Sequence, residues 1–230
     1  MNDESEHALG GIAPIRRGSV EQSVAGTLRE LIVSGRLPGG TPLVQRDLAQ
    51  RLGVSQTPVR LGLSELEREG LVQVGETGRA LVSRLTREDL EEIYAARLGL
   101  EGLAARVGAP ALTDKDVTRM QRLMSKLERI AGKRDVEAYL HARWDLHAIC
   151  YEASGRTRLV TEVERLFWRA ERYNRLVLST AARFERSVGY YHAFLDACKA
   201  REGDAAERVI HESMRQTVAD LAPSLPSEDA

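Results

Sequence analysis

The stretch LGVSQTPVRLGLSELEREGLV, residues 52–72, has a turn signal followed by a helical pattern whose first turn carries short polar side chains. Ser55, Gln56, Thr57 and Arg60 lie at this helix start, and Pro58 presets its backbone. Gln can pair with adenine, Arg with guanine or phosphate and hydroxyls with either, while a helix N-terminus attracts phosphate. The pattern predicts a helix end that contacts DNA. The simpler alternative is a structural helix capped by Ser55 and Thr57, with Arg60 in solvent.

A second set of chemically capable residues lies in the C-terminal half, where charged side chains share helical faces with apolar ones. One such face contains Leu90, Ile93, Arg97, Glu101 and Ala104. Another contains Val136, Leu140, Arg143, His147, Tyr151 and Ser154. Two guanidinium groups and an imidazole directed into one core would suit an anionic ligand, because guanidinium binds carboxylate bidentately. The alternative for Arg97 is an ion pair with Glu101, four residues further along the helix.

The elements that position the first set are three helices and a hairpin. Apolar periodicity predicts helices over 19–35, 44–53 and 55–69, with Ser19 as the first N-cap and Gly35 and Gly53 as stops. Two short strands, LVQVG and RALVSR, are joined by ETG and predict a hairpin whose tip is Thr77, Gly78 and Arg79. This order of elements indicates a winged helix-turn-helix.

From Thr86 onward the sequence has helical periodicity without strand-like alternation, which predicts an all-α antiparallel bundle of about six helices. Thr113 and Asp116 have capping-box spacing at one helix start. The expected fold is mainly α. Its divisions are a disordered tail at 1–14, a winged helix-turn-helix at 15–84, a helical domain at 86–222 and a second disordered tail at 223–230.

Composition places the chain among globular proteins, with 230 residues, 43% of them hydrophobic and 29% charged. No apolar run reaches the ~20 residues of a membrane span, and the polar N-terminus lacks the features of a signal peptide, so we expect a cytoplasmic protein. Cys150 and Cys198 fall on apolar helical stripes and are expected to be buried thiols. Residues 15–84 contain ten Arg, no Lys and seven acidic residues, a net of +3 that is compatible with a polyanionic partner.

The segment TPLVQRDLAQRLGVSQTPVRLGLSELEREGLV strongly resembles the DNA-binding domain of GntR-superfamily repressors, over about residues 15–84. The resemblance implies DNA contacts from the helix before the turn, from the recognition helix and from the wing. These are Arg46, Ser55, Gln56, Thr57, Arg60, Gly78 and Arg79. The family usually has Arg at the position of Gln56 and the pair Glu-Ala at Leu61 and Gly62. The chain therefore departs from the family at one base-reading position, while the phosphate-facing residues remain.

The C-terminal half is similar to the FCD ligand-binding domain of the FadR-type branch of this superfamily. The matching stretches are LTREDLEEIYAARLGLEGLAARVGA, DLHAICYEASGRTRLV and YYHAFLDACKAREGDAAERVIHESM. The resemblance implies an antiparallel helical bundle, a homodimer and a cavity that binds a small carboxylate, often beside a divalent metal such as Zn, Ni or Mn.

The metal set implied by this family is incomplete here. Family sites use an Asp and a His one turn apart together with two further His. His147 and His192 occupy two of these positions, whereas Arg143 stands at the Asp position and Ser213 at the remaining His position. Asp145 cannot substitute, because two residues correspond to about 200° on a helix. We therefore expect an effector held by Arg97, Arg143, His147 and His192, near Ser213, without metal; a divalent metal on His147 and His192 is the alternative. His211 lies at the edge of the last apolar stripe, and both site histidines could instead be hydrogen-bonded core groups.

These patterns predict a homodimeric transcriptional regulator, with repression the expected mode, that binds double-stranded operator DNA and responds to a small carboxylate effector. A metal-dependent α-helical enzyme is the main alternative. However, the sequence contains no HExxH motif, no glycine-rich phosphate loop and no nucleophile with a base at readable spacing. A further alternative is a C-terminal bundle that serves only for dimerisation. No membrane partner is expected.

Overall fold

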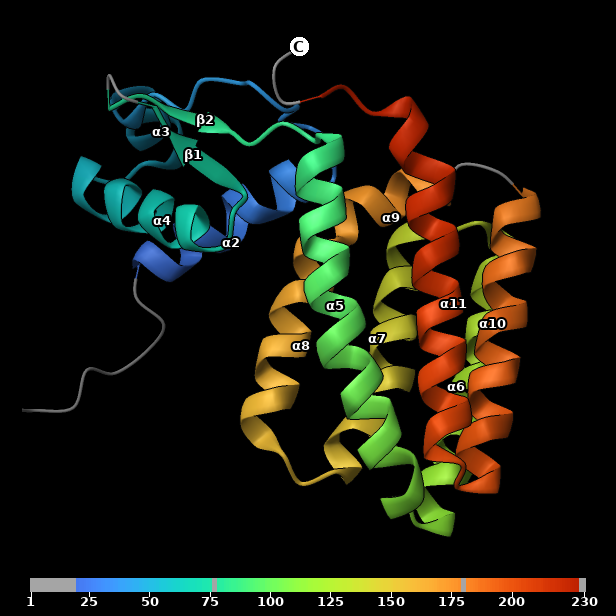
Figure 1. Cartoon of the computed structure of the whole chain (residues 1–230). Coiled ribbons are helices and arrows are strands. Elements are labelled where there is room, and N and C mark those ends of the chain that lie inside the picture. Colours follow the sequence, from blue (N-terminus) through green and yellow to red (C-terminus); the bar gives the residue numbers. More distant parts are fainter. Residues whose placement is uncertain (1–19, 76–77, 179–180, 228–230) are drawn as a thin grey trace, which may run out of the picture.

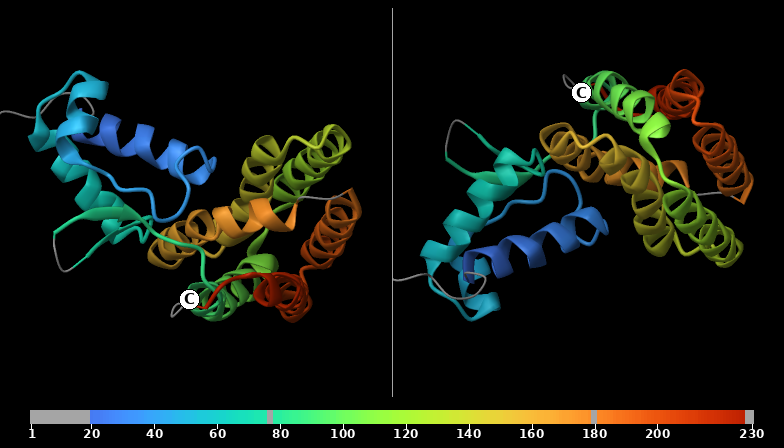
Figure 2. Two further views of the ribbon diagram at one scale, coloured as in Figure 1. Left: turned by 90° about the horizontal axis from the view of Figure 1, so that it is seen from above. Right: turned by 90° about the horizontal axis from the view of Figure 1, so that it is seen from below.

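The computed structural model describes residues 20–75, 78–178 and 181–227. The chain forms two lobes, a small N-terminal head and a larger helical bundle, which lie side by side in two perpendicular views (Figures 1 and 2). The expected tail at 1–14, the Ser19 cap and Thr77 at the wing tip lie outside the described residues.

Among the described residues, the head contains three helices, and apolar residues at helical spacing hold them together. They are α2 (Val20–Val33), α3 (Gln45–Leu52) and α4 (Gln56–Arg68). Leu28 and Ile32 of α2 pack with Val59, Leu63 and Leu66 of α4 in one buried cluster. Gly53 ends α3 in the left-handed conformation, at φ 67°, which makes the tight turn into α4 possible.

A two-stranded antiparallel hairpin completes the winged helix-turn-helix. Strand β1 (Val72–Val74) pairs with β2 (Ala80–Val82), with Val72 opposite Val82. Gly62 of α4 lies close to the backbone of α2. A Cβ added to Gly62 would lie 3.2 Å from the Ala25 nitrogen and 3.3 Å from the Glu21 carbonyl oxygen of α2. The glycine that departs from the family pattern therefore matches a tight helix contact.

Within the described residues, seven α-helices form the bundle, because the expected fourth helix is interrupted at Ala170. They are α5 (Arg87–Gly108), α6 (Asp114–Lys133), α7 (Val136–Ala153), α8 (Thr157–Arg169), α9 (Glu171–Val177), α10 (Ala181–Ala200) and α11 (Gly203–Leu221). Short 3-10 turns, η1 (Ala109–Ala111) and η2 (Ala222–Ser224), follow α5 and α11. The capping box of Thr113 and Asp116 at the start of α6 is present as expected. Cys150 and Cys198 are buried and free.

Helices α5 and α11 lie side by side along the bundle (Figure 1), and small residues allow their close approach. Gly102 of α5 faces His211 of α11, whose Nε2 donates to the Leu98 carbonyl oxygen at 2.9 Å. A Cβ at Gly102 would overlap the imidazole ring. His211 is therefore a packing residue between two helices.

Two residues in the part of the expected C-terminal tail that the structure describes, 223–227, contact the bundle. The Pro226 carbonyl oxygen accepts a hydrogen bond from the Arg87 amide at 3.0 Å, which satisfies a donor in the first turn of α5. Leu225 packs against the bundle core. Within the described part of the chain, no helix is long and apolar enough to cross a membrane.

Candidate functional site

The N-terminal end of α4 is an exposed polar surface. Ser55, Gln56, Thr57 and Arg60 are all exposed, while Val59 between them is buried in the head core. Ser55 precedes the helix in extended conformation, and its side chain makes no capping hydrogen bond. Ser55 thus occupies the N-cap position of α4, the position that the structural alternative gives it, but without a capping hydrogen bond from its hydroxyl.

The remaining predicted DNA contacts are also exposed. Arg46 of α3 has 84% of its side chain exposed, and its nearest carboxylate, Asp47, is 3.8 Å away. Gly78, at φ 73°, and Arg79 are exposed in the wing. The other end of α4, at Arg68, lines a groove against the bundle. The N-terminal end of α4 consequently points away from the bundle (Figure 1).

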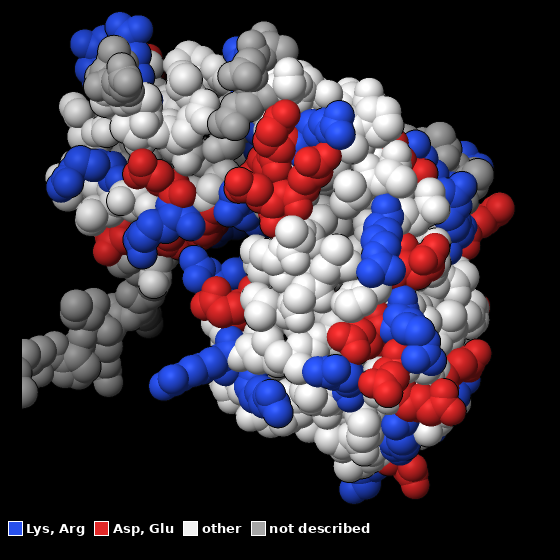
Figure 3. Space-filling model, in the orientation of Figure 1, with Lys and Arg blue, Asp and Glu red and all other residues white. Residues whose placement is uncertain are grey.

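The surface near the start of the bundle is acidic. Acidic side chains gather near the start of α5 (Figure 3), where the sequence carries Glu88, Asp89, Glu91 and Glu92. An acidic surface repels phosphate, so this face is unsuited to DNA.

In the bundle, the predicted stripe on α5 is buried, and Arg97 is already paired. Its Nε donates to Glu101 Oε1 at 2.7 Å, with side chains 3% and 0% exposed. Burial lowers the pKa of Arg97, but the Glu101 carboxylate together with Tyr94 and Tyr151 outweighs it, so that pKa is raised. The ion-pair alternative is confirmed for Arg97, which is therefore a weaker candidate for holding a ligand directly.

Glu101 anchors a hydrogen-bond chain that reaches α7. Tyr151 Oη donates to Glu101 Oε2 at 3.1 Å and lies 2.6 Å from Nδ1 of His147. Burial, followed by the nearby Glu101 carboxylate, raises the pKa of Tyr151 well above its ordinary value. Burial, with the charges of Arg143 and Arg97, lowers the pKa of His147 well below 6.5. Tyr151 therefore keeps its proton, and His147 is neutral near pH 7.

Arg143 differs from Arg97, because it has no ion pair with a carboxylate among the described residues. Its Nε donates to Tyr191 Oη at 2.6 Å, and its guanidinium lies over the rings of Tyr191 and Phe167. Nearby, Asn174 is buried and accepts a hydrogen bond from Tyr94 at 2.9 Å. The Asn174 Nδ2 is buried without an acceptor. Asn174 Nδ2 is thus a buried donor without an acceptor, an arrangement that costs free energy unless something accepts from it.

Arg143 and Asn174 line two small adjoining cavities, together with Ser213 and Thr217 of α11. The inner cavity also contacts Arg97, His147 and Tyr191, and leaves about 20 Å³ for water-sized occupants, enough for about one water. The outer cavity adds about 30 Å³ and reaches Arg186 and Asp220. These two ion-pair at 3.0 Å across its edge. The lining is suited to an anion, and a ligand would have to enlarge the space.

The structure does not bring His192 to this cavity. Its side chain is 51% exposed on α10, and its Nε2 lies 2.8 Å from Glu128 of α6. Within the described residues, no cluster of three or more His, Cys, Asp or Glu side chains could hold a metal. Arg143 stands one turn before His147 and would repel a cation. The donor set therefore does not fit the divalent metal that the family resemblance implied.

Sequence reasoning missed several cavity residues, Asn174 and Tyr191 above all. Asn174 lies on the short helix α9, whose existence depends on the break at Ala170, so no long periodic stripe pointed to it. Tyr191 stands directly before His192, and two adjacent residues project about 100° apart on a helix. The residue of α10 that lines the cavity is thus Tyr191, the neighbour of the predicted His192.

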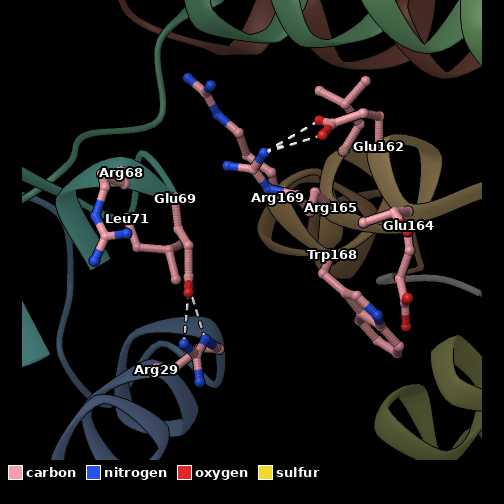
Figure 4. A pocket seen from close by; sticks show the side chains of 11 residues that line it. Arg29, Arg68, Glu69, Leu71, Glu162, Glu164, Arg165, Trp168 and Arg169 are labelled. Carbon is pink, nitrogen blue, oxygen red and sulfur yellow. Dashed lines mark hydrogen bonds and ion pairs between the residues drawn. The ribbon is translucent and has the colours of Figure 1, made fainter. Parts of the chain in front are cut away.

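A groove separates the head from α8, and both lobes line it (Figure 4). On the head side, Arg29 pairs with Glu69 at 2.6 Å. On the bundle side, Arg165 pairs with Glu162 at 3.1 Å. Arg169 extends from the end of α8 toward the head, and its Nη2 donates to Asp89 at 2.7 Å. The end of the recognition helix and the end of α8 thus meet in one charged region.

A winged helix-turn-helix with an exposed polar recognition-helix end, joined to a helical bundle, defines the class of two-domain bacterial transcriptional regulators. Residues 20–82 match the family described as bacterial regulatory proteins, gntR family, and residues 92–216 match the FCD domain. The chain belongs to the GntR family, in the FadR-type branch that carries an FCD domain.

Relatives agree with this assignment over nearly the whole chain. The HTH-type transcriptional regulator McbR of Escherichia coli (strain K12) is 26% identical over 213 residues, which cover 92% of this chain and 96% of McbR. The gluconate operon transcriptional repressor of Bacillus licheniformis is 25% identical over 206 residues. The match covers 86% of this chain and 84% of that repressor.

Solved structures show the same arrangement. E. coli McbR/YncC superposes with a TM-score of 0.75 at 26% identity, covering 90% of this chain and 99% of the other. The crystal structure of a putative GntR transcriptional regulator from Rhodococcus sp. RHA1 superposes with a TM-score of 0.73 at 23% identity. It covers 90% of this chain and 99% of the other, and it supports the fold. The relatives are transcription regulators.

Proposed function

We propose that this regulator is a homodimeric repressor whose affinity for operator DNA changes when a small carboxylate occupies the cavity between α7, α9 and α11. The observation that carries the proposal is Arg143, a guanidinium facing a cavity without a carboxylate partner among the described residues. The Asn174 amide, a buried donor without an acceptor, lines the same cavity. A carboxylate would accept from both groups and neutralise the charge.

For DNA, we propose that Gln56, Thr57 and Arg60 contact base edges and that Ser55 and Arg46 contact phosphate. Gly78 and Arg79 would follow the adjacent groove from the wing. Exposure of all seven side chains or backbone positions supports this assignment. Gln56 replaces an arginine usual in the family, so the operator would differ from the family's usual sequence at one position per half-site.

The small size of the cavity suggests how a bound ligand would change the affinity for DNA. The space for about one water is too small for an organic acid, so the ligand-bound state must differ from the present one. A ligand that binds one of two conformations more tightly shifts the population toward it. Phe167 of α8 contacts both cavity arginines, with its ring centre 5.5 Å from Arg97 Cζ and 5.9 Å from Arg143 Cζ. Two residues later, Arg169 reaches the head, so movement of α8 would change the position of the recognition helix.

The alternatives make different predictions. A metal-dependent enzyme would convert a carboxylate to product, whereas the donor set around His147 lacks the ligands for a metal within the described chain. A bundle that only dimerises would leave operator affinity unchanged by any acid. The relatives' names describe regulators, one of them a gluconate operon repressor, which supports a regulator and favours an organic acid as effector.

The test is a two-stage experiment on the full chain. Purified protein first selects its operator from a random DNA pool, and small carboxylates are then screened for a change in operator affinity, with metal content measured by elemental analysis. We expect metal-free protein with at least one acid that changes DNA affinity and raises the melting temperature. Turnover of an acid, or about one metal per chain that is required for the response, would contradict the proposal.

A further inference from the structure

Helix α6 carries a row of positive charges along its exposed face. The cations recur at alternating steps of four and three residues, which keeps them within about 80° of one another around the helix axis. All six are exposed, and we call them the basic stripe: Lys115, Arg119, Arg122, Lys126, Arg129 and Lys133. The opposite face of α6, with Met120, Met124 and Leu127, is buried in the bundle. The basic stripe therefore faces solvent over a length of about 27 Å.

No acidic residue in the described part of the chain neutralises the basic stripe. None of its six side chains forms an ion pair or a hydrogen bond with a described residue. The acidic residues of α6 have other partners, since Asp116 belongs to the capping box and Asp114 binds Arg201 at 3.0 Å. Glu128 lies 2.8 Å from His192 of α10. Like charges one turn apart destabilise a helix, so an anionic partner would stabilise this one.

The basic stripe is separate from the recognition helix. Helix α6 packs against α7 and α10, on the side of the bundle away from the head (Figures 1 and 2). A two-fold contact centred on the stripe would place cations of one protomer against the same cations of its partner. Such a contact is repulsive, so the proposed dimer leaves this surface free for another molecule.

The residue types on α6 indicate which polyanion fits. The helix has no aromatic residue on which the bases of a single-stranded nucleic acid could stack. Its apolar face is buried in the bundle and cannot insert into a membrane. Duplex DNA requires neither feature, because it presents about one negative charge per 1.7 Å of its axis, and Lys and Arg contact its phosphates at any sequence.

We propose that the basic stripe is a second DNA-binding surface, which holds the phosphate backbone of duplex DNA of any sequence while the head holds the operator. The regulator thereby connects two DNA segments. DNA bound at the head keeps further duplex at a high local concentration, which favours DNA over an acidic protein as the partner. The inference goes beyond the effector proposal, because it uses no residue of the cavity.

The test is a bridging experiment on the full chain. Protein bound to its selected operator, which carries a donor dye, is mixed with an unrelated duplex that carries an acceptor dye, at about 50 mM salt. We expect energy transfer between the two duplexes. The logarithm of the affinity for the second duplex should fall with the logarithm of salt concentration, with a slope as steep as about −5 for six phosphate contacts. Absence of energy transfer, or a slope near zero, overturns the proposal.

A triple variant tests whether the basic stripe holds the second duplex. Arg122→Gln, Lys126→Gln and Arg129→Gln together should weaken bridging about tenfold or more and reduce the salt slope by about one for each cation removed. Operator affinity should stay unchanged, because the head is untouched. Exposed Gln is a good helix former, so we expect a folded variant, which circular dichroism checks. Bridging by this variant at wild-type affinity overturns the proposal.

The matched control removes the same number of exposed cations at α8. Arg156→Gln, Arg158→Gln and Arg165→Gln together should leave bridging as in wild type. An equal loss in both triple variants would show an effect of total charge and overturn the assignment to α6. Flotation with vesicles of phosphatidylserine and phosphatidylcholine in equal parts is measured in parallel. Vesicle capture that requires the basic stripe, without bridging of DNA, would assign the surface to a membrane and overturn the proposal.

Discussion

Arg169, at the end of α8 in the bundle, lies directly against Gly70, which follows the recognition helix in the head. A Cβ added to Gly70 would be 2.8 Å from the Arg169 Cζ, and Gly70 has a φ of 74°. The same arginine binds Asp89 at the start of α5, and Tyr173 Oη donates to the other oxygen of that carboxylate at 2.8 Å. Head, α5 and α9 thus meet at a single guanidinium.

Arg169→Ala should weaken the link between the cavity and the head. We expect operator affinity without effector to stay within about threefold of wild type, while the change in affinity caused by the acid becomes several-fold smaller, in the range of about 1 kcal/mol of coupling. Fluorescence anisotropy with labelled operator measures both quantities. Arg165→Ala, on the same helix and in an exposed ion pair, is the matched control. An undiminished response in Arg169→Ala would exclude this contact from the coupling.

Arg60→Ala should abolish operator binding while the proposed dimer stays intact. Arg60 is exposed near the start of α4, so its removal leaves the core unchanged. Each half-site should lose about 1–3 kcal/mol of binding free energy, and a dimer would lose twice this amount. Gel-shift titration and sedimentation measure DNA binding and assembly, and Arg119→Ala, exposed on α6, controls for the lost charge. An Arg60→Ala protein that shifts operator at wild-type affinity would refute the assignment.

Arg143→Ala should leave DNA binding intact and remove the response to carboxylates. The charged hydrogen bonds lost are worth about 1.5–3 kcal/mol, or tenfold or more in acid affinity. Thermal-shift titration with the acid measures the loss. Because Arg143 also contacts Tyr191, circular dichroism should first establish that the variant is folded. A folded variant with the wild-type dose curve would show that the acid binds elsewhere.

Stability should fall below pH 6.5 in a way that depends on His147. Burial and the charges of Arg143 and Arg97 hold the pKa of His147 well below 6.5 in the folded chain. The unfolded chain takes up a proton near its ordinary pKa, so stability is full above that pH and declines as the pH falls toward the lowered folded pKa. Urea unfolding from about pH 7.5 to about pH 5.5 should show a shallower decline in His147→Gln.

The control for this measurement is His192→Gln, which removes an exposed histidine on α10. The wild-type decline should persist in that variant. An identical pH profile for wild type and His147→Gln would contradict a buried neutral imidazole at this position.

Gly102→Ala should destabilise the bundle. The new methyl would overlap the His211 imidazole and break its hydrogen bond to the Leu98 carbonyl, at a cost of about 1–3 kcal/mol for overpacking. Thermal unfolding followed by circular dichroism measures the change. Gly99→Ala is the matched control, because a Cβ there meets no other atom within 4 Å. It should be neutral or slightly stabilising, since Ala favours helices. Equal melting temperatures for both variants would refute the packing argument.

Much of the fold could be predicted from the sequence, because the helices have strong apolar periodicity and clear end signals. Gly53 and the capping box at Thr113 mark two boundaries that the structure has. The break at Ala170 was missed, because α8 and α9 read as one periodic segment. The hydrogen bond accepted by the Pro226 carbonyl oxygen could not be predicted either, since its donor is the Arg87 amide of α5, far away in the sequence.

The candidate site was only partly predictable. Periodicity placed Arg97, Arg143 and His147 on inward faces, and all three line the inner cavity. Periodicity could not predict whether Arg97 pairs with Glu101 or binds a ligand. Both roles are compatible with the same spacing of residues on the helix. Periodicity also could not find Asn174, whose role depends on how α9 is placed. His192 was assigned by alignment to the family, and the structure places its side chain toward Glu128.

The most direct test of a carboxylate-controlled regulator is operator binding by metal-free wild-type protein, measured by fluorescence anisotropy with and without saturating acid. The structure predicts tight binding to the selected operator and a change in Kd of about fivefold or more when acid is added, with a chelator present throughout. An operator Kd that no carboxylate changes would contradict the account and leave the bundle as a dimerisation module. If the acid changes the operator Kd only after a divalent metal is restored, the acid binds to a metal and not to Arg143.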